Sequence, residues 1–179
     1  MNICVYCSAS ENIAPAYFEL ATDLGAALAL RGDTLVYGGS SVGLMGQLAR
    51  TAQAKGGRVV GVIPQALVDM EVAYHHADEL VVTATMRERK AAMEARADAF
   101  IALPGGVGTM EEVFEIMAAR SLKLIDKPLV LLNHEHFYDP LLALLEHMRG
   151  ANFLRVEIAA MIYLAVSVED ALSYIDGYL

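Results

Sequence analysis

The sequence predicts an α/β protein with a Rossmann-like, doubly wound, mainly parallel sheet of about seven strands flanked by helices, in a single domain spanning residues 1–179. Three observations predict this class. Short apolar runs alternate with segments of helical spacing, the intervening helices of about 10–16 residues are too long for hairpins, and the chain has the length of one ordinary domain. Such a sheet is buried on both faces, and ligands bind beyond the carboxyl ends of its strands.

Seven apolar runs are predicted as strands because they are short, rich in β-forming residues and bounded by turn residues. They cover, in chain order, residues 2–7, 34–37, 58–63, 80–82, 99–103, 128–132 and 162–166. Glycine or proline directly follows three of them, at Gly38, Pro64 and Pro104, where the chain must turn.

Six segments with apolar residues at helical spacing are predicted as helices. They cover residues 15–30, about 42–54, 86–97, 110 to about 122, 138–148 and 169–178. Gly32 ends the first helix, Gly56 ends the second, and Thr85 with Glu88 forms a capping box at the start of the third. The less regular stretch 64–78 contains a short helical piece.

Composition and charge exclude several classes of protein. Thirteen Lys and Arg against 22 Asp and Glu give a formal charge of −9, which argues against a general nucleic-acid binder. The longest apolar stretch, residues 158–168, is far shorter than the ~20 residues of a membrane-spanning helix. With no basic leader and two cysteines, we expect a cytoplasmic protein. An apolar content of 56% excludes disorder and predicts apolar surface for a partner subunit.

Two glycine-rich turns, residues 38–46 and 104–112, follow predicted strands and open predicted helices. Glycine lets backbone N–H groups approach a ligand closely, and a helix N-terminus attracts an anion. Either turn alone is equally consistent with glycines that only tighten a connection, but the two together favour a phosphate-bearing ligand. Neither turn matches the P-loop or the dinucleotide pattern G-x-G-x-x-G, which disfavours both kinds of site.

The segment 86–96 is basic within an acidic chain, and Met86, Arg89, Lys90 and Met93 fall on one face of its predicted helix. This face has two interpretations. It is either a solvated surface on which Lys and Arg cover the core, or a partly buried face whose charges contact an anionic ligand. On this helix alone, the solvated surface is slightly favoured.

Glu111, Glu112 and Glu115 crowd the first turns of the helix after the second glycine-rich turn. Carboxylates at this end of a helix are stabilised by its dipole, which explains each of them without a function. If the basic helix lies beside this one, however, an arginine and Glu112 converge on one ligand. Such a pair could hold a ribose while a bond to it breaks.

Residues 104–112 read P-G-G-V-G-T-M-E-E, the P-G-G-x-G-T-x-x-E signature of the Lonely Guy (LOG) family, which the chain resembles over nearly its whole length. The other matching segments are 4–10, 36–46, 64–71, 86–93 and 129–133. Members of this family resemble nucleosidases that cleave cytokinin riboside 5′-monophosphates, and often AMP, to free base and ribose 5-phosphate. Many bacterial members carry the label "possible lysine decarboxylase". The resemblance implies a hydrolase that needs no cofactor and forms a homodimer.

The resemblance also implies roles for individual residues. Arg89 and Glu112 match the catalytic pair of the family. The positions that match its substrate-binding residues are Gly39, Ser40, Glu71, Met86, Lys90, Gly105, Gly106, Val107, Gly108, Thr109 and Glu111. Two departures stand out: Arg87 replaces a common His, and residues 118–121 read A-A-R-S in place of T-W-A-Q. A preference for an N6-substituted base is therefore not implied.

Two rival functions remain open at this level. The first is a non-catalytic nucleotide carrier or sensor with the same pocket. The second is a lysine decarboxylase dependent on pyridoxal phosphate, which is disfavoured because no lysine stands in a context typical of a Schiff base.

Two further motifs are expected to have no chemistry. Cys4 and Cys7 resemble a redox pair, but on one strand these positions face opposite sides. The histidines at 75–76 and 134–136 lack the H-E-x-x-H spacing and are expected to face solvent, so no metal site is expected.

Overall fold

The computed structural model describes residues 1–70 and 72–178, in which seven strands form one sheet with the order β4-β3-β2-β1-β5-β6-β7. Every pairing is parallel, as predicted. The strands are β1 (Asn2–Tyr6), β2 (Thr34–Tyr37), β3 (Val59–Pro64), β4 (Glu79–Thr83), β5 (Ala99–Ala102), β6 (Leu129–Leu132) and β7 (Tyr163–Ala165). Each of the seven predicted strands is present, and β4 is one residue longer at each end than expected.

The predicted helices are present too, and the fourth of them begins three residues earlier than expected, at Val107 instead of residue 110. They are α1 (Pro15–Leu30), α2 (Gly43–Ala54), α4 (Met86–Arg96), α5 (Val107–Ser121), α6 (Asp139–Gly150) and α7 (Val168–Tyr178), with α3 (Gln65–Val68) as the short helical piece. Two single turns, η1 (His134–His136) and η2 (Ile158–Ala160), complete the described chain. Within that described chain, each helix falls short of the length and apolarity needed to cross a membrane.

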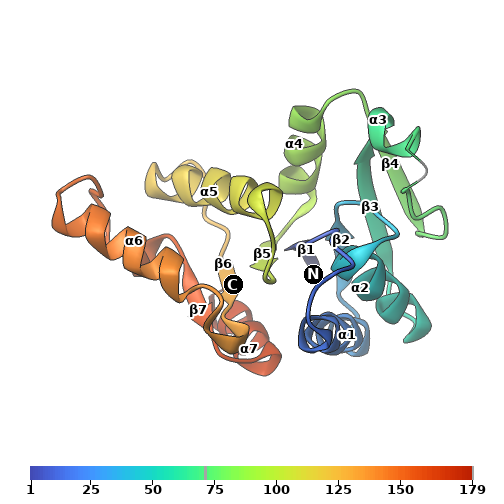
Figure 1. Cartoon of the computed structure of the whole chain (residues 1–179), viewed down its shortest axis with the longest axis horizontal. Helices are drawn as coiled ribbons and strands as arrows, with labels where there is room; N and C mark the ends of the chain where they lie inside the picture. The colour runs from blue at the N-terminus through green and yellow to red at the C-terminus, as the bar shows by residue number, and fades with distance from the viewer. Residues whose placement is uncertain (71, 179) are drawn as a thin grey trace.

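The helices cover both faces of the sheet. Helices α1, α2 and α7 lie on one face, and α4, α5 and α6 lie on the other (Figure 1). Two separate apolar clusters result, one between each helical layer and the sheet. Leu24 and Leu48 belong to the first cluster, and Met93 and Ile116 belong to the second. A sheet buried on both faces explains why its strands read as continuous apolar runs.

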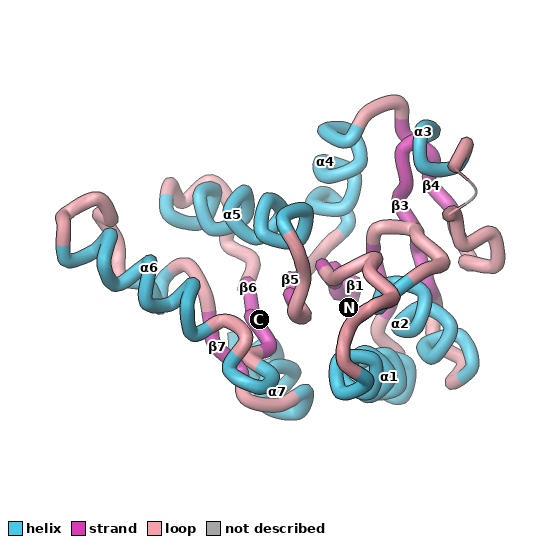
Figure 2. The backbone as a smooth tube through the Cα atoms, in the orientation of Figure 1, coloured by secondary structure: helices cyan, strands magenta, loops and turns pink. Residues whose placement is uncertain are grey.

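The strand order reverses at β1, which lies between β2 and β5 (Figure 2). The chain first builds outward from β1 to β4, and then returns through α4 to place β5 on the other side of β1. The loops that leave β1 and β5 therefore turn to opposite faces and leave a crevice between them. Ligands of open parallel sheets bind at this position.

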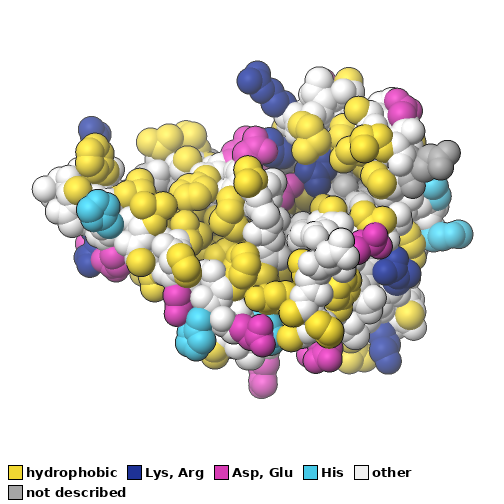
Figure 3. All heavy atoms as spheres, viewed as in Figure 1, with side chains coloured by type: hydrophobic (Ala, Val, Ile, Leu, Met, Phe, Trp, Pro, Cys, Tyr) yellow, Lys and Arg dark blue, Asp and Glu magenta, His cyan; other side chains and the backbone are white. Residues whose placement is uncertain are grey.

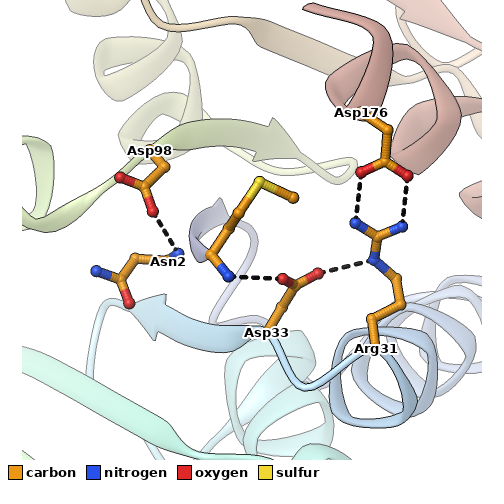
Figure 4. Close-up of polar contacts among 6 residues, drawn as sticks. Asn2, Arg31, Asp33, Asp98 and Asp176 are labelled. Carbon is orange, nitrogen blue, oxygen red and sulfur yellow. Dashed lines mark hydrogen bonds and ion pairs between the residues drawn. The ribbon is translucent and has the colours of Figure 1, made fainter. Parts of the chain in front are cut away.

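An ion-pair network closes the opposite, amino-terminal edge of the sheet (Figure 4). Buried Asp33 accepts from the Met1 ammonium at 2.8 Å and from Arg31 Nε at 2.7 Å. The same guanidinium binds both carboxylate oxygens of Asp176, at 2.6 and 2.8 Å. The network thus ties the start of β1 and the end of α1 to α7, far from the crevice.

Candidate active site

Helix α4 places the Arg89 side chain in the protein interior. The threonine half of the predicted capping box is present, because the Glu88 backbone N–H donates to Thr85 Oγ1 at 3.1 Å. The Glu88 carboxylate accepts from the Ala84 N–H at 3.0 Å, one residue before the N-cap. Because this cap fixes where the helix begins, Arg89 turns inward and only 5% of it is exposed. Its Nε donates to the Val62 carbonyl at 3.0 Å, and its Nη1 donates to Glu112 Oε1 at 2.8 Å.

Glu112, the partner of Arg89, comes from the second turn of α5 and is 7% exposed. Two effects oppose each other at its carboxyl group. Burial raises the pKa of Glu112, and the adjacent Arg89 guanidinium lowers it through charge and hydrogen bonding. Burial is the larger effect, so the pKa of Glu112 lies above its ordinary value. The carboxylate therefore holds its proton more tightly than an exposed glutamate does.

Lys90 links the two helices beside this pair. Its Nζ lies 2.8 Å from Glu111 Oε1 and 3.0 Å from Glu115 Oε2, and these hydrogen bonds raise the pKa of Lys90. With Arg89 and Met93 both buried, the basic face of α4 is not the solvated surface that the helix alone slightly favours. The face is partly buried and its charges pair with glutamates of α5, and contact with an anionic ligand stays a prediction.

The turn before α5 leaves hydrogen-bond donors free. Met110 N–H donates to the Gly106 carbonyl at 3.0 Å, whereas the N–H groups of Val107, Gly108 and Thr109 bond to no other residue that the structure describes. They form the N-terminus of a 15-residue helix, where a partial positive charge gathers. The Thr109 side chain is buried against Gly105, whose missing Cβ would lie 2.1 Å from Thr109 Oγ1.

The turn before α2 is different, because the protein itself takes up N–H groups that were expected to stay unpaired there. The N–H groups of Leu44 and Met45 both donate to the Ser8 carbonyl, at 3.0 and 3.3 Å. Ser41 N–H donates to the Val72 carbonyl at 2.7 Å. Protein carbonyls thus occupy two of the first three N–H groups of α2, those of Leu44 and Met45. Gly43, at φ +60°, allows this approach because a Cβ there would lie 2.4 Å from the Ala9 carbonyl carbon.

These elements surround a cavity of about 400 Å³ at the carboxyl ends of β1, β2 and β5. Eight of the residues expected to act in the site line it: Ser40, Met86, Arg89, Gly106, Gly108, Thr109, Glu111 and Glu112. The polar groups lie along α4 and α5, and the facing wall is mostly apolar, with Met45, Leu67 and Val72 among its residues. The arrangement suits a ligand with an anionic end and an apolar end.

Known proteins resemble this chain over most of its length. Residues 45–175 match a family model described as "Possible lysine decarboxylase". The cytokinin riboside 5′-monophosphate phosphoribohydrolase of Mycobacterium tuberculosis is 46% identical over 170 residues, which are 95% of this chain and 90% of that protein. The probable phosphoribohydrolase LOGL1 of Oryza sativa subsp. japonica is 42% identical, over 98% of this chain and 79% of that protein. The chain belongs to the LOG family.

Solved structures place this LOG protein in a wider fold group. The molybdenum cofactor binding protein of Rippkaea orientalis superposes with a TM-score of 0.73 at 25% identity, over 98% of this chain and 95% of that one. The molybdenum cofactor carrier protein of Chlamydomonas reinhardtii gives a TM-score of 0.71 at 23% identity, over 99% and 96% of the two chains. At these identities the likeness shows a shared fold.

Four residues that the LOG resemblance implies do not line the cavity: Gly39, Lys90, Gly105 and Val107. Gly39 and Gly105 lie beside lining residues, Lys90 pairs with two glutamates, and Val107 is 87% exposed. Glu71 lies outside the described residues. The cavity also has lining residues that sequence reasoning did not single out: Cys7, Ser8, Ala9, Gly38, Val42, Met45, Leu67, Met70 and Val72. Most of these follow β1 and β3. The rule that ligands bind beyond the carboxyl ends of parallel strands could therefore have identified them from the sequence.

The two departures from the LOG pattern lie outside the cavity. Residues 118–121 are at the other end of α5, where Arg120 is buried and donates to the Ala160 carbonyl at 3.1 Å and to the Tyr178 hydroxyl at 3.2 Å. Arg87 is exposed on α4. Neither change reaches the Arg89–Glu112 pair in this chain.

The cysteines and most of the histidines lie where the sequence predicts. Cys4 and Cys7 belong to opposite apolar clusters, and burial raises the pKa of both thiols. His75, His76 and His136 are exposed, but the prediction is wrong for His134, whose ring is half-buried edge-on against Tyr17. In the described chain, no three His, Cys, Asp or Glu side chains gather to hold a metal.

Proposed function

We propose that this LOG-family protein hydrolyses the N-glycosidic bond of nucleoside 5′-monophosphates, either cytokinin riboside 5′-monophosphates or AMP, to free base and ribose 5-phosphate. One observation carries the proposal. The buried Arg89–Glu112 pair, joined at 2.8 Å, lies in the same cavity as the free donors at the start of α5. The activity named for the relatives in Mycobacterium tuberculosis and Oryza sativa subsp. japonica supports it.

The 5′-phosphate binds at the start of α5 in this proposal. The unbonded N–H groups of Val107, Gly108 and Thr109 and the helix dipole supply the attraction, and the Thr109 hydroxyl adds a further polar contact. Binding energy released at the phosphate is used to hold the distant C1′ atom in place. A nucleoside without the phosphate should therefore lose turnover as well as affinity.

Glu112 acts at the sugar. Cleavage passes through a ribosyl group with positive charge near C1′, which a nearby carboxylate stabilises. The base departs with the bonding electrons and takes up a proton from solvent, while water adds to C1′ as Glu112 removes its proton and later returns it to solvent. Burial raises the pKa of Glu112, and this makes the ionised carboxylate a stronger base than an exposed one. Arg89 orients Glu112 and keeps it ionised by charge and hydrogen bonding.

Glu112→Gln tests this role. The amide keeps the size of the side chain but cannot accept the proton of water, so we expect the turnover of AMP to fall by about 100-fold or more, with little change in affinity. Base release is followed by chromatography and affinity by calorimetry. Adenosine serves as the control substrate for the phosphate contact. If Glu112→Gln released base at the wild-type rate, the assigned role would be wrong.

A nucleotide carrier of the same fold is the second candidate, because two of the structural neighbours are a cofactor carrier and a cofactor-binding protein. The buried ion pair next to the phosphate site argues for catalysis, since binding alone does not need a carboxylate at the sugar. The two functions separate in one measurement. An enzyme releases free base from AMP over many turnovers, whereas a carrier returns AMP intact.

The protein acts as a homodimer in this proposal, with a mononucleotide rather than a nucleic-acid polymer as its ligand and the cytoplasm as its location. Apolar side chains gather over α5 and α6 on the face shown in Figure 3. The exposed ones on these helices include Val107, Phe114 and Leu144. An apolar face of this kind is typical of a subunit interface.

A further inference from the structure

The guanidinium of Arg89 lies directly over the backbone of Gly38, the residue that follows β2. A Cβ atom on Gly38 would lie 2.1 Å from Arg89 Nη2 and 3.2 Å from Arg89 Cζ. These distances are far below van der Waals contact, so Arg89 occupies the space that any side chain at position 38 would need. The Met45 sulfur, at 2.8 Å from the same point, closes the other side.

The backbone conformation does not explain why this residue is glycine. The φ angle of Gly38 lies outside the left-handed region, in contrast to Gly39 at +74° and Gly43 at +60°. Alanine could therefore adopt the backbone of residue 38 without strain. What alanine cannot do is share its space with Arg89.

The contact with Gly38 is one of three that fix the guanidinium. Val62, near the end of β3, accepts from Nε at 3.0 Å, and Glu112 of α5 accepts from Nη1 at 2.8 Å. Gly38 lies against the remaining nitrogen, Nη2, and both residues line the cavity. The ends of β2 and β3 thus form a seat for Arg89, and the seat exists only while position 38 has no side chain.

We propose that Gly38 is a positioning residue for the reaction: its missing side chain makes the space in which Arg89 Nη2 lies, and so holds the guanidinium against Glu112. This inference rests on the proposed function, because positioning matters only if the pair acts on a ligand. It explains the glycine at position 38 by the space that the Arg89 side chain needs, rather than by contact with a phosphate or by the geometry of the turn.

Gly38→Ala is expected to keep the fold and lose most of the activity. The atoms that must move are the far ends of the Arg89 and Met45 side chains, which can shift without moving the sheet. Because Arg89 then leaves its seat, its alignment with Glu112 is lost. A displacement of about 1 Å in a catalytic arrangement costs about 100-fold in turnover, and we expect a loss of this size.

The pH dependence gives a second readout that a purely structural defect would not move. The groups that face Glu112 are Arg89 and Lys90 on α4, Glu111 on α5, the Tyr6 hydroxyl, and the Cys4 and Cys7 thiols. Arg89 is the strongest of the influences that lower the pKa of Glu112. When Gly38→Ala displaces it, the acid limb of the pH–activity profile should move to higher pH.

A double-mutant cycle with Arg89→Lys tests the contact itself. Lysine has no Nη2 atom, so an alanine at position 38 has only the Met45 sulfur left to displace. We expect Gly38→Ala to lower kcat for AMP about 100-fold in the wild-type background and less than about threefold in the Arg89→Lys background. Urea unfolding of the same four proteins provides a cycle that needs no activity, and it should show the same coupling between the two positions.

Gly57→Ala is the matched control, because a Cβ there would lie 2.8 Å from the Ala29 Cβ at the far edge of the sheet. It should lower stability equally in both backgrounds and leave the acid limb in place. Equal effects of Gly38→Ala in both backgrounds, or an unchanged kcat and acid limb, would overturn the proposal. A wild-type protein that releases no base overturns the proposed function instead, and the unfolding cycle then still decides whether Gly38 seats Arg89.

Discussion

Replacing Arg89 by Met should destabilise the protein by an amount that depends on pH. The side chains of Arg89 and Glu112 are only 6% and 8% exposed, so the change leaves a carboxylate buried without its cation. Breaking a buried pair from one side costs about 3–5 kcal/mol. A domain of this size has roughly 5–15 kcal/mol of stability, so the variant should remain folded at 25 °C with a much lower unfolding midpoint.

The sign of the pH effect follows from the pKa of Glu112, which burial raises even in the presence of Arg89. Without Arg89 this pKa rises further, whereas in the unfolded chain it returns to about 4.3. Between these two values the folded variant binds more protons than the unfolded chain, so its free energy of unfolding falls as the pH rises. The deficit relative to wild type is therefore largest at pH 8 and shrinks towards pH 4.5.

Urea unfolding at pH 8 and pH 5, followed by circular dichroism, measures both values. Arg149→Met is the control, because Arg149 forms an exposed pair with Glu146 at 2.7 Å and its loss should leave the midpoint almost unchanged at either pH. A deficit for Arg89→Met that is the same at both pH values would refute the reasoning. It would mean that the lost free energy comes from packing rather than from the stranded charge of Glu112.

Two further predictions concern regions away from the site. Asp176→Asn removes a carboxylate that binds Arg31 at 2.6 and 2.8 Å, and the pKa of Asp176 is lowered by this contact. The variant should show a small decrease in Tm at pH 7, and this decrease should disappear only as the pH falls through the lowered pKa of Asp176, where the wild-type carboxyl is protonated too. Phe114→Asp places a charge on the apolar face of α5, and we expect sedimentation to show a dimer for the wild type and a monomer for the variant. A dimeric Phe114→Asp protein would exclude that face as the interface.

Much of the fold could be predicted because its signals are local. The capping box of Thr85 and Glu88 places the start of α4 correctly, and that start decides which residues of the helix turn inward. The apolar runs identify all seven strands because both faces of the sheet are covered. The rule for parallel sheets then places the cavity at the carboxyl ends of β1, β2 and β5, where it is found.

The different roles of the two glycine-rich turns could not be predicted, because they depend on residues distant in sequence. Both turns have the same local pattern of glycines before a helix. The Ser8 carbonyl, which follows β1, takes the donors of Leu44 and Met45, and no feature of residues 38–46 reveals this. Likewise, the burial of Arg89 follows from Val62 and Glu112, which come from two other elements.

The glycines of these turns therefore have to be understood one at a time. Gly38 leaves space for a guanidinium, Gly43 lets the chain pass close to Ala9, and Gly105 leaves space for the buried Thr109 side chain. At all three positions the missing side chain leaves room for another part of the protein rather than for a ligand. The proposed anion site depends instead on what the protein leaves unbonded, which is the first turn of α5. A glycine-rich turn after a strand indicates that other atoms approach its backbone closely. Only the hydrogen-bond partners of its N–H groups tell whether a ligand can approach as well.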